Sequence, residues 1–342
     1  MIVSVSLNAS IDKMVEIESF QYGGMNRIQN ISGEDAAGKG INVALAAKTL
    51  GLDVACIGFL PEENADSVLE CLDKAGCRHE FIRIEGCLRV NTKIYDRKKG
   101  VVTELNEAGP AVTPDNLEAM IQLMQKWQDK ASVFVLTGSL PPGCPVDFYR
   151  QLISQTTVRC IMDTEGEKLL QGLKAKPFLI KPNDYELELA VGRKLQEKKD
   201  MITAARELIT GNKLYNHDES QSGGESNDNS ESYLDSVSNH KNTKGMSAGM
   251  ALVSMGGKGA FITDAERGWF APPVPITVKS TVGAGDCMVA GILYGLTSGT
   301  DMAHILRCGM AAGTAGCLSE GTQLLRRDDF LNLIEKVQIK EV

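Results

Sequence analysis

The clearest chemical signal in the sequence is the run Ser280-Thr281-Val282-Gly283-Ala284-Gly285-Asp286, which lies between an extended stretch and an apolar helix-forming stretch. Glycines before a helix leave consecutive backbone N–H groups free, and together with the helix dipole these groups form a site for an anion. A carboxylate in the first helical turn can then reach a substrate hydroxyl beside that anion. An aspartate that caps a helix after a glycine turn gives the same pattern, so the run alone leaves both interpretations open.

A second glycine-rich run, GEDAAGKGIN over residues 33–42, is close to a P-loop but departs from it. The P-loop pattern ends in a Ser or Thr hydroxyl that binds Mg²⁺, and Gly40 stands in that position here. The residues before the run are also too polar for the buried strand that precedes a P-loop. We therefore expect Gly38 and Gly40 to let the backbone approach a ligand closely, while Lys39 and Asn42 supply polar contacts.

The run KPNDYE, residues 181–186, directly follows the short apolar run Phe178–Ile180. Its proline ends a strand and biases Lys181 toward an extended conformation. Asn183 and Glu186 are three residues apart and share a face if a helix begins there. A helix start with an asparagine cap would account for the same residues.

The run SMGGKG, residues 254–259, separates the two short apolar runs Ala251–Val253 and Ala260–Thr263. A glycine hairpin turn would explain it. The same glycines would also let a nucleotide lie against the backbone.

The elements that would position these motifs alternate along the chain. Short apolar runs predict strands at Ile2–Leu7, Val54–Phe59, Val133–Leu136, Val158–Met162, Phe178–Ile180 and Ala251–Val253. Helical periodicity predicts helices at Gly40–Leu50, Ala65–Ala75, Pro114–Lys130, Val146–Gln155, Glu165–Leu173, Asp200–Ile209, Gly285–Ser298, Met302–Leu318 and Arg327–Val337. This alternation predicts an α/β fold with a mostly parallel sheet covered by helices on both faces.

Three stretches differ from this alternation. Residues 13–31 and 87–105 interleave polar and apolar residues, which predicts a small sheet with one wet face, and we expect it to form a lid over one edge of the main domain. Residues 211–247 form a low-complexity insertion with too few apolar residues to offset the entropy of ordering. This insertion would be a tolerated surface loop or a regulatory, partner-binding one. We expect the chain, 1–342, to form a single domain.

Composition excludes several classes of protein. The formal net charge of −8 argues against a nucleic-acid binder. The sequence has no run of about 18 apolar residues, so we expect no membrane span. The start of the chain lacks the pattern of a secretion signal. The nine cysteines are an odd number without CxxC spacing, and only four histidines occur. We therefore expect a cytoplasmic protein with reduced thiols and a mechanism that does not depend on histidine.

Taken in order, these motifs resemble those of the ribokinase-like carbohydrate kinases. The motifs that carry the resemblance are Leu7-Asn8 followed by Asp12, Gly38–Asn42, Thr137–Gly143, Lys181-Pro182-Asn183, Ser254–Gly259 and Val282–Asp286. Within this superfamily the chain resembles the phosphofructokinase B-type branch, most of all bacterial 1-phosphofructokinases and next tagatose-6-phosphate kinases. The resemblance covers nearly the whole chain except 211–247. It implies a mostly parallel central sheet flanked by helices, with a small β-sheet lid.

The resemblance also implies a role for each matching residue. Asp286 would be the catalytic base, and the amides of Gly283, Ala284 and Gly285 would form an anion hole for the transferring phosphoryl group. Asn183 and Glu186 would arrange Mg²⁺ through water. The nucleotide site would comprise Lys181, Asn183, Ser254, Gly256, Gly259, Thr281, Gly283 and Gly285. Sugar hydroxyls would be held by Asp12, Gly38, Asn42 and Ser139, and the existing phosphate of the substrate by Arg27, Lys39 and Arg89.

The implied reaction is transfer of a phosphoryl group from ATP to the C6 hydroxyl of fructose 1-phosphate, which gives fructose 1,6-bisphosphate. The run from Arg89 and the run Thr103–Pro110 look most like 1-phosphofructokinases. Tagatose-6-phosphate kinase and 6-phosphofructokinase activities are the alternatives, and a catalytically weak sugar-phosphate sensor is a third. The resemblance further implies a homodimer formed through the lid.

Two positions depart from the family pattern. Ala9 stands where the family has proline, and Ala37 stands where it has a first glycine before the lysine. If that glycine adopts a positive φ, Ala37 implies a different loop, which bears on sugar selectivity more than on activity.

Overall fold

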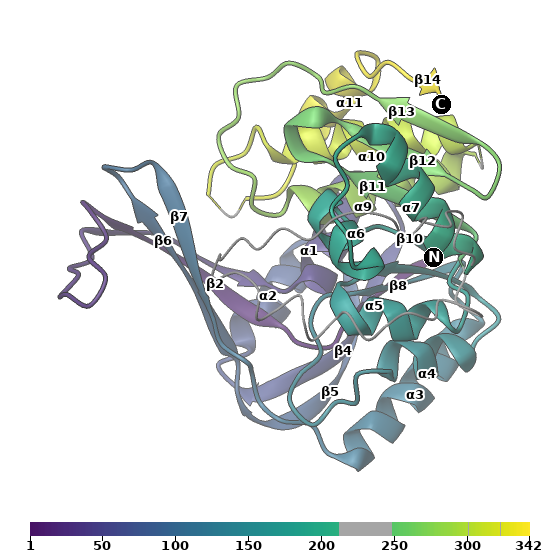
Figure 1. The fold of residues 1–342 in the computed structure, drawn as a ribbon. Coiled ribbons are helices and arrows are strands. Elements are labelled where there is room, and N and C mark those ends of the chain that lie inside the picture. The colour runs from purple at the N-terminus through teal and green to yellow at the C-terminus, as the bar shows by residue number, and fades with distance from the viewer. Residues whose placement is uncertain (212–247, 300, 322) are drawn as a thin grey trace, which may run out of the picture.

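The computed structural model describes residues 1–211, 248–299, 301–321 and 323–342, and its main body is built on a large sheet (Figure 1). The strands of this sheet are β1 (Ile2–Ser6), β4 (Val54–Glu63), β5 (Arg78–Cys87), β8 (Val133–Thr137), β9 (Arg159–Asp163), β10 (Leu179–Ile180), β11 (Met250–Ser254), β12 (Ala260–Thr263), β13 (Gly268–Ala271) and β14 (Lys340–Glu341). Their order across the sheet is β14-β13-β12-β11-β10-β9-β8-β1-β4-β5. The strands from β5 to β11 in this order are parallel, whereas β12, β13 and β14 pair antiparallel.

Helices cover both faces of the large sheet. They are α1 (Lys39–Thr49), α2 (Asp66–Lys74), α3 (Pro114–Gln128), α4 (Phe148–Ser154), α5 (Gly166–Leu173), α6 (Asp184–Val191), α7 (Lys198–Thr210), α9 (Ala284–Ser298), α10 (Met302–Gly316) and α11 (Arg327–Ile334). Strand side chains alternate between two hydrophobic clusters, as the pleat requires. Val54 and Cys56 of β4 join the cluster that includes α1, α9 and α10, whereas Ala55 and Ile57 join the cluster that includes α3, α4 and α7. The predicted α/β fold is therefore confirmed.

A separate four-stranded sheet forms the lid, which projects to the left in Figure 1. Its strands are β2 (Ser10–Ile17), β3 (Asn30–Ala37), β6 (Arg89–Asp96) and β7 (Val101–Asn106), in the order β3-β2-β6-β7. The strand bounds differ from the expected stretch 13–31, because residues 18–29 connect β2 to β3 and lie outside both strands. The expected insertion 211–247 lies, apart from Gly211, outside the described residues.

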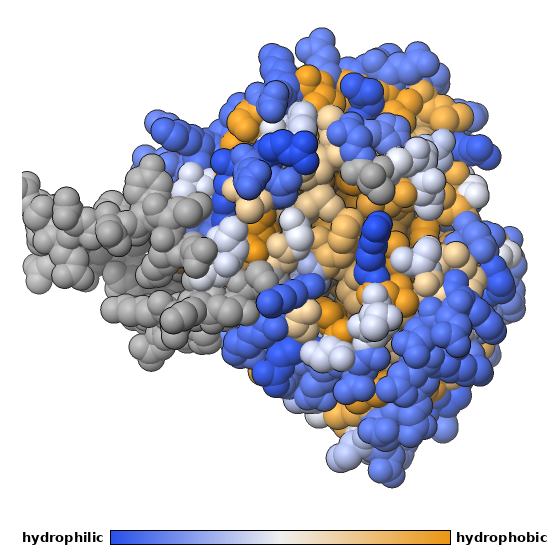
Figure 2. All heavy atoms as spheres, turned by 90° about the vertical axis from the view of Figure 1, so that its right-hand side faces the viewer, coloured by the Kyte–Doolittle hydropathy of each residue, from blue (hydrophilic) through white to orange (hydrophobic). Residues whose placement is uncertain are grey.

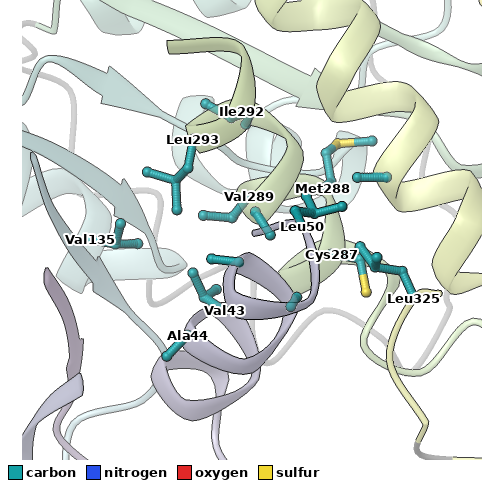
Figure 3. Close-up of a cluster of buried hydrophobic side chains, with 14 of the residues drawn as sticks. Val43, Ala44, Leu50, Val135, Cys287, Met288, Val289, Ile292, Leu293 and Leu325 are labelled. Carbon is teal, nitrogen blue, oxygen red and sulfur yellow. The ribbon is translucent and has the colours of Figure 1, made fainter. Parts of the chain in front are cut away.

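The hydrophobic packing between α1 and α9 fixes the part of the molecule that carries the chemical motifs. Val43 and Ala44 of α1 belong to the same buried cluster as Val289 and Leu293 of α9, and Val43 lies on the side of α1 that faces α9 (Figure 3). Gly40 allows α1 to pack tightly on β1, because a Cβ at this position would lie 2.7 Å from the Ser6 Cα atom. The first turns of α1 and α9 are thus held next to each other by the core.

Cys287, which follows the predicted base, belongs to this same core (Figure 3). Its side chain is fully buried, and burial raises the pKa of its thiol to about 12. All nine cysteines are described, and all are free thiols. The position of Cys287 at a helix N-terminus therefore does not make it a reactive thiolate.

The side of the molecule away from the lid, shown in Figure 2, carries hydrophilic and hydrophobic residues intermixed. Within the described parts of the chain, no helix has both the length and the apolar character needed to cross a membrane.

Candidate active site

Two cavities meet at the N-terminus of α9. The larger has a volume of about 830 Å³ and the smaller about 400 Å³. Four residues line both of them: Lys39, Glu186, Gly283 and Asp286. A ligand in the larger cavity and a ligand in the smaller one would therefore face each other across these side chains.

Asp286 lies in the first turn of α9, at the junction of the two cavities, and only 6% of its surface is exposed. Asn42 Nδ2 of α1 donates a hydrogen bond of 2.8 Å to Asp286 Oδ2. Burial raises the pKa of Asp286 to about 6, although the nearby charge of Lys39 opposes this rise. The carboxylate is thus fixed in position and is a stronger proton acceptor than an ordinary aspartate.

The proposed anion-hole residues form the start of α9. Gly283 is the N-cap with φ of +72°, a conformation that favours glycine, and Ala284 and Gly285 begin the helix. The Ala284 amide donates a 3.3 Å bond to Thr281 O, so a bound anion would compete with that long contact for this N–H group. No acidic side chain other than Asp286 lies in the first turn, which leaves the positive end of the helix dipole open to an anion.

A buried carboxylate, Asp163, links the two lysines of the site. Lys39 Nζ lies 3.5 Å from Asp163 Oδ2, and Lys181 Nζ lies 3.2 Å from Asp163 Oδ1. Burial alone would raise the pKa of Asp163, but Lys181 and Lys39 outweigh burial and hold this pKa below its ordinary value. Asp163 in turn raises the pKa of Lys39. Lys39 therefore stays charged at the junction of the cavities, and Lys181 pairs with the other oxygen of Asp163 on the side of the larger cavity.

Asp163 was missed by the sequence analysis, although a signal for it existed. It is the last residue of β9, and ligands of parallel α/β sheets bind at the carboxyl ends of the strands. Asp163 directly follows the predicted strand Val158–Met162, so its place at the carboxyl end of that strand could have marked it as a candidate site residue.

The larger cavity contains every residue assigned to the nucleotide. Its lining includes Lys181, Asn183, Ser254, Gly256, Gly259, Thr281, Gly283 and Gly285. Apolar side chains, among them Val274, Ile276 and Met310, line the same cavity. Such a mixture of apolar wall and convergent polar groups suits a nucleotide, whose base is flat and whose phosphates are charged.

The run SMGGKG forms the hairpin turn that the sequence allowed, and it also borders the larger cavity. Residues Gly256–Lys258 form a 3₁₀ turn between the antiparallel strands β11 and β12, as in a hairpin. Ser254, Gly256 and Gly259 also line the larger cavity.

Asn183 and Glu186 form a reciprocal capping box at the start of α6. The Asn183 side chain accepts a 2.8 Å bond from the Glu186 amide, and Glu186 Oε2 accepts a 2.8 Å bond from the Asn183 amide. Glu186 lines both cavities and is nearly buried, and burial raises the pKa of its carboxyl group. Among the described residues no hydrogen bond to its Oε1 atom is found, which fits Mg²⁺ held mainly by waters and phosphates with few protein ligands.

The smaller cavity contains all but one of the residues assigned to the sugar phosphate. Its lining includes Asp12, Gly38, Lys39, Asn42, Arg89 and Ser139. Arg27 is the exception, since it is exposed in the connection between β2 and β3 and lines neither cavity. The structure therefore does not bring Arg27 together with Lys39 and Arg89, because the lid carries this connection away from the main body.

Arg89 is held by protein oxygens at the base of the lid. Its Nη1 atom donates to Glu107 O over 2.9 Å, and its Nη2 atom donates to Asn8 O over 3.0 Å. Its Nε atom donates to Ala9 O over 3.3 Å. The guanidinium thus has few free N–H groups, and its position ties together three segments that meet where the lid joins the sheet.

The structure places the two departures from the family pattern, Ala37 and Ala9, and the two glycines Gly40 and Gly38. Ala37 is the last residue of β3, pairs with Ser10 and does not have a positive φ, so its backbone conformation does not require a glycine. Ala9 is buried. Gly40 was expected to approach a ligand, but it is packed against β1 and lines neither cavity. Gly38 does line the smaller cavity, with φ of +116°.

The lid contributes polar side chains to the smaller cavity that the sequence analysis did not assign. They are Ser10 on β2, Asn91 and Lys93 on β6, and Glu104 and Asn106 on β7. Together with Asp12 and Arg89 they occupy alternate positions on three strands, so one face of the lid is the wall of this cavity. In the sequence, Arg89, Asn91 and Lys93 occupy alternate positions, and this pattern could have predicted that they share one face of a strand.

Comparison with known proteins agrees with this arrangement. The family model described as "pfkB family carbohydrate kinase" matches residues 5–215 and 216–328. The 1-phosphofructokinase of Escherichia coli (strain K12) is 30% identical over 342 residues, covering 99% of this chain and 98% of the relative. The 1-phosphofructokinase of Vibrio cholerae serotype O1 is 29% identical, covering 99% and 96%. The crystal structure of phosphofructokinase-2 from Escherichia coli in complex with fructose-6-phosphate has 25% identity and a TM-score of 0.80, covering 98% of each chain.

Proposed function

The chain belongs to the pfkB family of carbohydrate kinases, and on this basis we propose that it transfers the γ-phosphoryl group of ATP to the C6 hydroxyl of fructose 1-phosphate. The observation that carries this proposal is the position of Asp286, a buried carboxylate at the junction of two cavities. The larger cavity would take ATP, which kinases of this family use, and the smaller one the sugar phosphate.

In this mechanism Asp286 accepts the proton of the attacking hydroxyl. The bond from Asn42 occupies Asp286 Oδ2 and leaves Oδ1 to face the hydroxyl. Removal of the proton as the new O–P bond forms is worth roughly 10²–10⁴-fold in rate. The carboxylate form is the active one, and it predominates above a pH of about 6, because the pKa is raised to about 6.

The start of α9 and the two lysines stabilise the charge that develops on the transferring group. Phosphoryl transfer depends mainly on positioning and on neutralisation of charge on the equatorial oxygens. The amides of Gly283 and Gly285 would donate to these oxygens. Lys39 and Lys181, held by Asp163, would lie on the side of the larger cavity. Mg²⁺, when bound near Glu186 through water, would neutralise part of the charge on the phosphates.

The choice of fructose 1-phosphate is supported by the relatives named 1-phosphofructokinase, which match nearly the whole chain at 29–30% identity. The solved structure with fructose 6-phosphate bound, at 25% identity, makes 6-phosphofructokinase activity the principal alternative. A tagatose-6-phosphate kinase is a further alternative. A sugar-phosphate sensor without turnover is the alternative of a different class.

A steady-state assay over several sugar phosphates separates these possibilities. Purified protein with MgATP is tested with fructose 1-phosphate, fructose 6-phosphate and tagatose 6-phosphate, and ADP release is measured by a coupled assay. We expect the highest kcat/KM with fructose 1-phosphate. A higher value with either 6-phosphate would refute the proposed substrate, and absence of turnover with all three would favour the sensor.

We also propose that two chains associate through their lids. The lid exposes large apolar side chains, among them Tyr22, Met25, Ile28, Val101 and Leu105, with exposed fractions between 49% and 99%. The lid has a hydrophobic cluster of only a few residues of its own, around Val15, Ile17 and Ile94. Exposed apolar surface of this kind marks an interaction site, and a second copy of the lid would cover it.

A further inference from the structure

The smaller cavity contains a nearly buried ion pair that the mechanism above does not use. Lys93 Nζ lies 2.5 Å from Asp12 Oδ2, and the two residues are 5% and 7% exposed. Asn91 Nδ2 donates to Asp12 Oδ1 over 3.0 Å, and Ser10 Oγ donates to the same atom over 3.3 Å. Asp12 is therefore held on both oxygens by side chains of two adjacent lid strands.

The lid places Lys93 in the cavity wall. On β6 the residues Arg89, Asn91 and Lys93 alternate and so share one face, and all three line the smaller cavity. An ammonium group has three N–H donors. Among the described residues, the hydrogen-bond partner of Lys93 Nζ is Asp12, so further donors can face the cavity.

The charge of the pair indicates which part of the substrate it meets. Lys93 and Asp12 together carry no net charge, and the carboxylate would repel a phosphate placed beside the ammonium group. A sugar hydroxyl, by contrast, both donates and accepts a hydrogen bond. It can donate to Asp12 and accept from Lys93 at the same time, and both bonds would be charge-assisted.

We propose that Lys93 is a substrate-binding residue that, together with Asp12, holds one hydroxyl of the sugar and not its phosphate. This inference deepens the proposed function, because it takes a sugar phosphate as the ligand of the smaller cavity. Lys93 is then a determinant of which hydroxyl configuration the enzyme accepts, and Arg89 remains for the phosphate.

The test combines Lys93→Met with substrates that lack one hydroxyl. Values of kcat/KM are measured at saturating MgATP for fructose 1-phosphate and for its analogues deoxygenated at C2, C3 or C4, with wild-type and variant enzyme. For the full substrate we expect Lys93→Met to lower kcat/KM about 10–100-fold, with KM for ATP unchanged. For one analogue we expect wild-type and variant enzyme to have equal kcat/KM, because the hydroxyl that Lys93 binds is already missing from that analogue.

If Lys93→Met lowers kcat/KM by the same factor for every analogue as for the full substrate, the inference is wrong. Lys93 would then act on the phosphate or only on the structure of the lid. Lys13→Met is the matched control, because Lys13 is the neighbour of Asp12 on β2, pairs with Glu34 at 3.6 Å and does not line the smaller cavity. We expect it to change none of these values.

Loss of Lys93 leaves a buried carboxylate without its partner, which can prevent folding. If the single variant does not fold, the variant Asp12→Asn with Lys93→Met removes both charges, and the same set of analogues is measured. If wild-type enzyme does not phosphorylate fructose 1-phosphate, the proposed function fails. The inference is then tested with the sugar phosphate that the enzyme does accept, and its deoxy analogues.

Discussion

Replacement of Asp286 by asparagine tests the catalytic base with almost no change of shape. Asn42 Nδ2 donates to Asp286 Oδ2 over 2.8 Å, so the asparagine oxygen would take that position and its NH₂ group would face the sugar hydroxyl. An amide NH₂ cannot accept a proton. We therefore expect kcat to fall by about 10²–10⁴-fold, which is about 2.7–5.5 kcal/mol in activation free energy, while KM for ATP changes little.

The pKa of Asp286 predicts opposite effects of this substitution on activity and on stability. Its pKa in the folded chain is about 6 against an ordinary 3.8, so folding disfavours the charged form. This penalty is absent below pH 3.8 and complete above about pH 6, where a rise of about 2 in pKa corresponds to about 3 kcal/mol. Asp286→Asn should therefore be at least as stable as wild type at pH 8, and this advantage should shrink as the pH falls below 6.

The assay is steady-state ADP release with saturating MgATP, together with thermal unfolding at pH 5 and pH 8. In wild type, kcat/KM for the sugar phosphate should decrease below a pH of about 6, and this decrease should be absent in the variant. Asp115→Asn is the matched control, since Asp115 also lies in the first turn of a helix, α3, and lines neither cavity. A kcat for Asp286→Asn within about threefold of wild type would refute the assignment of the base.

Three further predictions follow from the described contacts. Arg89→Ala should weaken binding of the sugar phosphate by about 1–3 kcal/mol, measured as a rise in its KM, and an unchanged KM would show that the phosphate lies elsewhere. Deletion of residues 213–245 should leave kcat and the melting temperature nearly unchanged, because Ala248 N already donates to Ile209 O over 2.9 Å and a short loop can join these ends; a large loss of activity would contradict this. Light scattering at micromolar concentration should give the mass of a dimer for wild type and of a monomer for Leu105→Asp, and a monomeric wild type would exclude association through the lid.

Much of the fold could be predicted from the sequence because local pattern and tertiary structure agree. The buried parallel strands are short apolar runs, and the helices show clear periodicity with caps such as Thr113 and Asn183. The strand β3 is different, because a run rich in Gly, Ala and acidic residues has low strand propensity. Pairing with β2 overrides that propensity, and this is a tertiary effect that no local pattern contains.

The candidate site could be predicted where a motif contains both the residue and its spacing. The run that ends in Asp286 is of this kind. Its residues Thr281, Gly283 and Gly285, which were assigned to the nucleotide, line the larger cavity. Contacts between distant segments were beyond such reasoning. The pairing of Asp163 with Lys39 and Lys181, and the engagement of Arg89 by backbone oxygens, depend on segments that only the folded chain brings together.

The most direct test of the account is to identify the product formed from fructose 1-phosphate. Wild-type protein is incubated with MgATP and fructose 1-phosphate, and the mixture is followed by ³¹P NMR. The account predicts that a second phosphomonoester signal, at C6, appears in step with ADP and that Asp286→Asn forms it at least about 10²-fold more slowly. ADP formation without a phosphate at C6, or no reaction at all, would contradict the account.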